Sequence, residues 1–146
     1  MWSKAKEAIL ASSNESSIYI GCDSLCIPKK QVAEYSTVVI LHVDSKHGCK
    51  VFHNKVSMPD YGNLRMRLLT EVGLALEAFY AVEEVIGNRK LEIHLDVNPD
   101  PIHASNIVTK EALGWVRGLG LEAKIKPYSF AASTAADHCV RPGNTV

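Results

Sequence analysis

The spacing of the apolar residues changes part-way along the chain and divides it into a strand-rich half and a helix-rich half. Residues 2–10 carry apolar side chains at helical spacing and predict a short amphipathic helix. Apolar, β-branched runs at 18–24, 34–43 and 50–56 predict three strands. The segments between these runs are short, and 44–48 has the length of a hairpin loop, so an antiparallel meander is expected.

From residue 64 onward, stretches with a period near 3.6 residues alternate with short strand-like runs. Residues 64–86 predict a long helix that ends at a Gly-Asn pair. The later elements are, in order, a strand at 90–96, a helix at 105–119, a short strand at 121–126 and a helix at 130–140. The sequence therefore predicts an α/β fold. Its five-stranded mixed sheet has three antiparallel strands, followed by strands alternating with helices that flank the sheet.

Composition and charge are those of an ordinary globular protein. The 146 residues predict a single domain over 1–146, with 1–16 as an N-terminal helix or extension. Sixteen basic residues balance sixteen acidic ones, which excludes a global basic field for nucleic acid but not a local patch. No apolar run reaches the roughly 18 residues of a membrane span. The first residues also lack the apolar core of a signal peptide, so we expect a cytoplasmic protein with no membrane partner.

Two aspartates stand at the predicted ends of apolar strands. Asp23 closes the run at 18–24, and Asp96 closes the run at 90–96. For Asp23 the ordinary alternative is a turn residue, because aspartate is a poor strand residue. The two strands are parallel neighbours if the helix between them makes a right-handed crossover. Both carboxylates would then lie at the carboxyl ends of the strands, where open α/β sheets bind ligands.

A glutamate lies on the apolar face of the long predicted helix. Glu71 falls between Leu68 and Ala75 in a stripe of apolar residues at helical spacing. A carboxylate on a buried face is informative, because glutamate is rarely buried without a partner. The alternative is an ion pair with Arg67, one turn earlier on the same helix.

The last predicted helix adds a fourth carboxylate, Asp137, to this series. Several acids that converge on one cleft repel one another strongly, and a divalent cation removes that repulsion. Ligand sets made only of oxygen favour Mg²⁺ or Mn²⁺ over Zn²⁺. Two such ions roughly 4 Å apart can hold the attacking and leaving oxygens of a phosphodiester.

The order of elements and the acidic series resemble the ribonuclease H-like fold, and more narrowly the YkuK-type family of ribonuclease H-like proteins. The matching segments are IYIGCDS at 18–24, RLLTE at 67–71, IHLDVN at 93–98 and the stretch from Lys126-Pro127 to Ala135-Ala136-Asp137. Together they span roughly residues 17–140. Residue by residue, the resemblance implies a metal-binding and catalytic set made of Asp23, Glu71, Asp96 and Asp137.

Four further residues are candidates for contacts with a substrate. Ser24 and Asn98 follow the two aspartates and would reach substrate or metal-bound water, although turn formation explains both equally well. His94 is two residues before Asp96 and hence on the same strand face, with a buried core histidine as the alternative. Lys126 ends the last predicted strand near the same edge and would bind a phosphate.

The interpretation that unites these residues is a metal-dependent nuclease that hydrolyses phosphodiester bonds of nucleic acid with two Mg²⁺ or Mn²⁺ ions. One alternative is a nucleic-acid-binding or protein-binding module that keeps the fold but does not cut. Another is a structural subunit that works as an oligomer. The intact acidic series favours the enzyme, and the net charge of zero favours the binding module.

Overall fold

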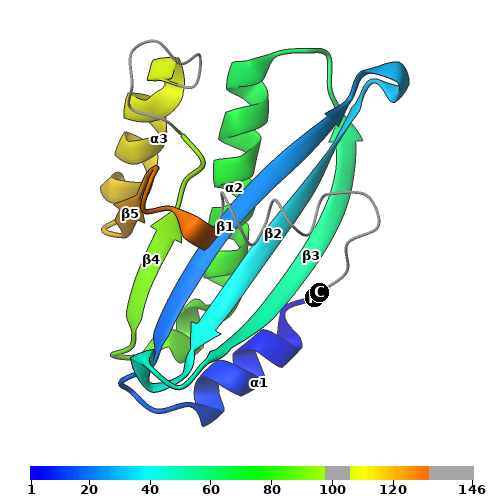
Figure 1. Ribbon diagram of the computed structural model, residues 1–146. Coiled ribbons are helices and arrows are strands. Elements are labelled where there is room, and N and C mark those ends of the chain that lie inside the picture. Colours follow the sequence, from blue (N-terminus) through cyan, green and yellow to red (C-terminus); the bar gives the residue numbers. More distant parts are fainter. Residues whose placement is uncertain (98–105, 132–146) are drawn as a thin grey trace.

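The computed structural model of the chain describes residues 1–97 and 106–131. The described elements alternate strands and helices in the order expected from the sequence (Figure 1). In chain order they are α1 (Ser3–Ala11), β1 (Ser17–Ile27), the short 3₁₀ helix η1 (Pro28–Lys30), β2 (Val32–His42), the 3₁₀ helix η2 (Val43–Ser45), β3 (Cys49–Pro59), α2 (Leu64–Ile86), β4 (Lys90–His94), α3 (Asn106–Gly118) and β5 (Glu122–Lys124).

The five strands form one mixed sheet in the order β3-β2-β1-β4-β5. The pairs β1–β2 and β2–β3 are antiparallel, and the pairs β1–β4 and β4–β5 are parallel. This arrangement confirms the predicted α/β fold and the predicted meander. It also confirms that β1 and β4 are parallel neighbours, joined by α2 as the crossover helix.

Several strand boundaries differ from the prediction, and two of them affect the acidic residues. The strand that carries Asp23 was expected to end near it, but β1 continues to Ile27 and pairs Asp23 with Ser36 of β2. The extra length comes from the hairpin with β2, whose turn at η1 leads into Gln31 with a φ of 52°. In the opposite sense, β4 ends at His94, two residues before Asp96. Asp23 therefore lies inside one strand, and Asp96 lies beyond the end of its neighbour.

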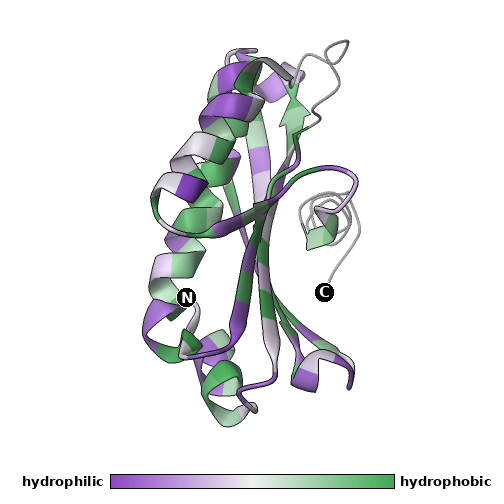
Figure 2. Cartoon of the chain, turned by 90° about the vertical axis from the view of Figure 1, so that its left-hand side faces the viewer, coloured by the Kyte–Doolittle hydropathy of each residue, from purple (hydrophilic) through white to green (hydrophobic). Residues whose placement is uncertain are grey.

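Helices cover one face of the sheet, and a shorter stretch near residue 130 lies against the other, as the side view in Figure 2 shows. Side chains alternate between the two faces along β1. Ile18, Ile20 and Cys22 belong to the main core with α1, α2 and α3. Tyr19 points the other way and packs with a second cluster that contains Ala131. This alternation decides which side chains of β1 can reach α2.

The helix α2 has the bounds that its sequence predicted. The Asn63 side chain caps its start by accepting a hydrogen bond from the backbone N–H of Met66, at 3.0 Å. Gly87, with a φ of 56°, follows its end. The apolar stripe is buried against the sheet, and Glu71 is buried with it at 6% exposure.

The helix α3 packs beside α2 through Val108, Ala112 and Val116, while Trp115 is 43% exposed. Of these two neighbouring residues, Val116 therefore faces inward. Within the described residues, no helix has the length and apolar character needed to cross a membrane.

Candidate metal centre

Three of the four predicted carboxylates come together at one edge of the sheet. Asp23 of β1, Glu71 of α2 and Asp96 after β4 each place one carboxylate oxygen within 4.8 Å of the others. Asp23 and Glu71 are buried, at 8% and 6% exposure, and Asp96 is partly exposed. The prediction that Asp23 and Asp96 lie close enough to share an ion is therefore confirmed in its geometry. We call these three residues the acidic trio.

The unequal lengths of β1 and β4 explain how the trio assembles. The parallel pairing stops at Gly21 and His94, so β1 runs on past the end of β4. Because side chains alternate along β1, the side chain of Asp23 leaves the strand on the face opposite α2. The side chain of Glu71 comes from the face that α2 covers. The two carboxylates meet at the edge of β1 beyond the end of β4, where the chain after His94 also delivers Asp96.

Ser24 donates hydrogen bonds to two members of the trio. Its backbone N–H donates to Asp23 Oδ1 at 2.8 Å, and its hydroxyl donates to Glu71 Oε2 at 2.5 Å. The side chain of Ser24 shares the strand face of Cys22 and Ile20, which is the face that α2 covers. Ser24 thus links the strand and the helix that supply these two carboxylates.

Lys126 supplies the positive charge nearest to Asp96 in the described part of the chain. Its ammonium Nζ lies 2.9 Å from Asp96 Oδ1, with 42% of the lysine side chain and 17% of the aspartate side chain exposed. The residue follows β5, where Leu95 N–H donates to the carbonyl oxygen of Lys124 at 2.8 Å. The end of β5 therefore brings Lys126 to the trio, as its position in the sequence suggested.

A comparison with models of known protein families identifies the family of this chain. The family model described as ribonuclease H-like matches residues 1–141. The chain belongs to the ribonuclease H-like family. The resemblance to the YkuK-type members of this family is thereby confirmed.

One solved structure found to be similar is the protease–reverse transcriptase of prototype foamy virus. It has a TM-score of 0.39 and 11% sequence identity over 79% of this chain, and this chain covers 18% of the viral one. No curated protein matches the chain.

The electrostatics of this ribonuclease H-like site centre on Glu71. Burial, and next the negative charge of Asp23, raise the pKa of Glu71 well above its ordinary value. The hydrogen bond from Ser24 acts in the opposite direction, and Asp96 adds to the rise. The hydrogen bond from Lys126 to Asp96 raises the pKa of the lysine despite partial burial, and Asp23 and Glu71 add to this effect. The site is therefore one of excess negative charge.

Arg67 does not form the ion pair with Glu71 that was the alternative for this residue. Its guanidinium Nη1 lies 3.6 Å from Asp60 Oδ2, and the same oxygen accepts a hydrogen bond from the Cys26 thiol at 2.9 Å. Asp60 follows β3 directly and is buried at 9% exposure. Glu71 therefore faces Asp23 and Asp96, the other two members of the trio, on the buried side of α2 that the apolar stripe predicted.

His94 is buried, at 1% exposure, and its contacts match the alternative of a core histidine. Its Nε2 lies 2.9 Å from Glu92 Oε1, and its Nδ1 accepts a hydrogen bond from the Ala131 N–H at 3.1 Å. The ring also packs against Tyr19 and Phe130 on the face opposite α2. Both ring nitrogens of His94 therefore have partners within the protein.

Two predicted site residues, Asn98 and Asp137, lie outside the described residues. Sequence reasoning also missed the role of Ser24 as the donor to Glu71. A hydroxyl directly after a strand aspartate was the available signal, but its partner comes from a helix 47 positions away. The donor set of the trio consists only of carboxylate oxygens, which suits a hard cation such as Mg²⁺ or Mn²⁺.

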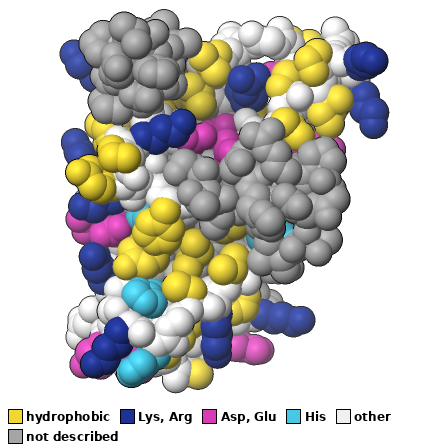
Figure 3. Space-filling model, viewed as in Figure 1, with side chains coloured by type: hydrophobic (Ala, Val, Ile, Leu, Met, Phe, Trp, Pro, Cys, Tyr) yellow, Lys and Arg dark blue, Asp and Glu magenta, His cyan; other side chains and the backbone are white. Residues whose placement is uncertain are grey.

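The surroundings of the trio are compact. Beside Glu71 and Asp96 lies a hollow of about 10 Å³, on the order of the space that one water molecule needs. The other residues that line it are Cys22, Leu68, Val72, His94, Leu95 and Val97. Figure 3 shows acidic side chains reaching the surface in the upper half of the molecule, with basic side chains beside them. This hollow is too small for a ligand much larger than a water molecule, so a larger ligand would lie outside it.

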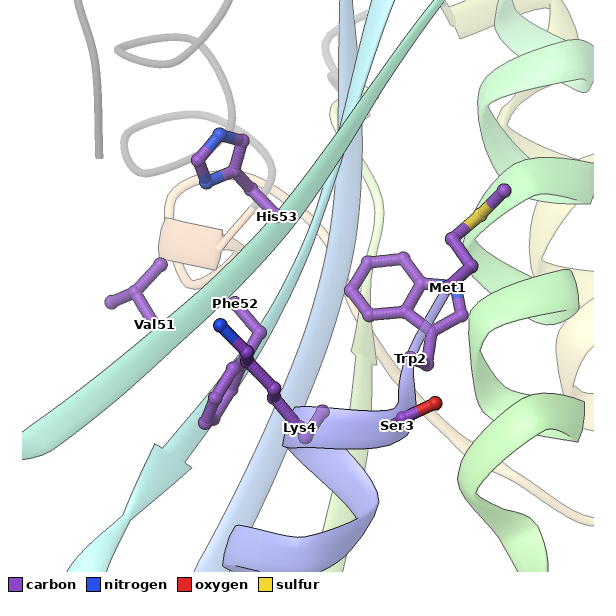
Figure 4. A pocket seen from close by; sticks show the side chains of 8 residues that line it. Met1, Trp2, Ser3, Lys4, Val51, Phe52 and His53 are labelled. Atoms are coloured by element: carbon purple, nitrogen blue, oxygen red, sulfur yellow. The ribbon is translucent and has the colours of Figure 1, made fainter.

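A larger hollow, of about 570 Å³, lies between the start of α1 and β3 (Figure 4). Its lining has no carboxylate and is made of Met1, Trp2, Ser3, Lys4, Ala5, Val51, Phe52 and His53. It therefore offers no oxygen-rich site for a divalent cation, and the trio remains the candidate centre among the described residues.

Proposed function

We propose that this ribonuclease H-like protein is a metal-dependent nuclease that hydrolyses phosphodiester bonds of nucleic acid. The observation that carries the proposal is the convergence of Asp23, Glu71 and Asp96 within 4.8 Å at the edge between β1 and β4. Three carboxylates held this closely are costly without a cation. After burial, the negative charge of Asp23 is the next cause of the raised pKa of Glu71.

In this proposal the trio holds Mg²⁺ or Mn²⁺, with Asp137 as the fourth ligand that the family resemblance implies. Two ions bound there would activate a water and stabilise the charge on the attacking and leaving oxygens of an in-line displacement. The protein's own contribution is to hold the carboxylates at fixed positions on β1, α2 and the segment after β4.

Lys126 and Asn98 are the proposed substrate contacts. An ammonium beside the trio is a point charge suited to a phosphate oxygen, and 42% of the Lys126 side chain is exposed. Asn98 follows Asp96 by two residues in the sequence, which is the basis for proposing it. The partner is a nucleic acid, RNA or DNA.

The second candidate is a binding module of the same fold that does not cut. One observation favours it: the chain has no net charge to attract a polyanion over a distance. The same trio and Lys126 would then serve recognition, with a bound metal in a structural role.

The test is a cleavage assay with Mn²⁺ and, separately, Mg²⁺, on single-stranded, duplex, hybrid and branched substrates. We expect cleavage of at least one substrate class that disappears in EDTA and in the Asp23→Asn variant. Glu92→Gln, which alters an equally buried carboxylate on the same sheet, is the matched control and should retain activity. Metal binding without cleavage of any substrate would reject the nuclease in favour of the binding module.

A further inference from the structure

We propose that Ser24 is a positioning residue, which holds Asp23 and Glu71 in the geometry that receives a divalent cation. The inference rests on the proposed metal-binding function of the trio and adds to it. It also replaces the substrate contact that the sequence suggested for Ser24. The observation is that two donors of one residue serve two different carboxylates.

The first donor fixes Asp23. The Ser24 backbone N–H donates to Asp23 Oδ1 at 2.8 Å, so the aspartate side chain turns toward the backbone of its own strand. Asp23 lies beyond the end of β4, since the parallel pairing stops at Gly21 and His94. One carboxylate oxygen is thereby engaged by the backbone of β1, and the strand sets the direction of the side chain.

The second donor fixes Glu71. The Ser24 hydroxyl lies 2.5 Å from Glu71 Oε2, and it connects β1 to a helix that packs across the sheet face. A glutamate has three rotatable side-chain bonds, and repulsion from Asp23 would turn it away from the trio. A hydrogen bond to the charged carboxylate opposes both effects, and it engages Oε2 of Glu71.

Such a donor has the position of an outer-shell partner of a metal ligand. Residues that orient ligating carboxylates by hydrogen bonds typically change metal affinity or activity by about 10–100-fold when they are removed. The backbone donor survives any substitution of Ser24 except proline, so side-chain variants isolate the bond to Glu71. Threonine keeps the hydroxyl and is well accepted in a strand, which makes it the conservative replacement.

The experiment measures Mn²⁺ binding by isothermal titration calorimetry for the full chain and for three variants at this position. They are Ser24→Ala, which removes the donor, Ser24→Cys, which replaces the hydroxyl by a slightly larger and weaker donor, and Ser24→Thr, which keeps the hydroxyl. The matched control is Ser57→Ala, a serine exposed on β3. Melting in EDTA reports whether each variant is folded, and Ser24→Cys carries the test if Ser24→Ala unfolds.

We expect Ser24→Ala and Ser24→Cys to bind Mn²⁺ about 10–100-fold more weakly than the unaltered chain. Ser24→Thr and Ser57→Ala should bind it as the unaltered chain does. Undiminished affinity in both Ser24→Ala and Ser24→Cys would overturn the positioning role, and so would a Ser24→Thr variant as weak as Ser24→Ala. In those cases the proposed metal site stands. An unaltered chain that does not bind Mn²⁺ would overturn both proposals together.

Discussion

Glu71 and Glu92 are buried to the same extent, at 6% exposure each, but their surroundings shift their pKa values in opposite directions. Glu71 faces Asp23 and Asp96 across the trio, and its nearest donor is the neutral hydroxyl of Ser24. Burial and then the charge of Asp23 raise its pKa. Its surroundings therefore disfavour the ionised form.

Glu92 lies on β4, on the opposite face of the sheet. Lys90 Nζ is 3.1 Å from its Oε2, and His94 Nε2 is 2.9 Å from its Oε1. Burial alone would raise the pKa of Glu92, but the hydrogen bonds from His94 and Lys90 outweigh it and lower the pKa. Burial and the Glu92 contact act oppositely on His94, and burial prevails, which lowers the pKa of the histidine.

The difference between the two glutamates lies in their partners and not in their burial. The negative charge of Glu92 is compensated by Lys90 and His94 of the protein itself, so this carboxylate has a structural role. Glu71 has two further carboxylates as neighbours, so a bound cation would offset their mutual repulsion. In this comparison, the buried carboxylate that is a candidate metal ligand is the one whose nearest charged neighbours are also negative.

The largest expected effect is a pair of stability changes with opposite signs in metal-free protein at pH 8. Glu92→Gln should destabilise by about 2 kcal/mol, because it weakens hydrogen bonds to a buried charged group. Glu71→Gln should stabilise by about 1 kcal/mol, because it removes a charge that its neighbours repel. Urea denaturation in EDTA measures both. Equal losses of stability in the two variants would contradict the opposite effects of the neighbouring charges on Glu71 and Glu92.

The pH dependence of stability should differ in the same way. A raised pKa means that the folded protein holds a proton that the unfolded chain releases. The contribution of Glu71 is therefore fully present below about pH 4.5 and is lost as pH rises through the folded-state pKa, by at most about 1.4 kcal/mol per pH unit. The contribution of Glu92 is present above about pH 4.5 and is lost as pH falls through its lowered pKa.

Urea denaturation in EDTA between pH 3.5 and 8, in steps of about half a unit, measures these slopes as differences from the Gln variants. Subtracting the Glu71→Gln curve should leave a contribution that declines toward alkaline pH. Subtracting the Glu92→Gln curve should leave one that declines toward acidic pH. Parallel slopes for the two glutamates would show that the neighbouring charges do not act as described.

The smallest expected effect concerns Lys126, whose ammonium lies beside the trio. Lys126→Met should tighten Mn²⁺ binding by about threefold, because the ammonium competes for Asp96 and a half-exposed ion pair is worth only about 0.2–1 kcal/mol. The same change should weaken nucleic-acid binding in the presence of the metal. Lys124→Met is the control, since its ammonium pairs with Glu122 at 3.1 Å. A similar tightening in both variants would indicate a general charge effect.

The fold was largely predictable because its signals are local. The bounds of α2 follow from Asn63, Gly87 and the apolar stripe between them, and all three can be read along the chain. The burial of Glu71 was predictable in the same way, as a carboxylate inside that stripe. Short turns between the first three strands likewise predicted the meander.

The details that failed depend on contacts between distant segments. The length of β1 is set by its pairing with β2, so Asp23 lies inside the strand and not at its end. The argument that put His94 on the face of Asp96 holds only within a strand, and β4 ends at His94. The bond from Ser24 to Glu71 forms only after α2 packs on the sheet. No local pattern in the sequence encodes these three facts.

The most direct test of a cation site at the trio is the stability gained on adding Mn²⁺ to the unaltered chain, to Glu71→Gln and to Glu92→Gln. At a hundredfold excess over the dissociation constant, binding should stabilise the unaltered chain by about 2.7 kcal/mol. Glu92→Gln should gain the same amount, and Glu71→Gln should lose most of the gain at the same Mn²⁺ concentration. Absence of any gain in the unaltered chain, or an equal gain in all three proteins, would contradict the account.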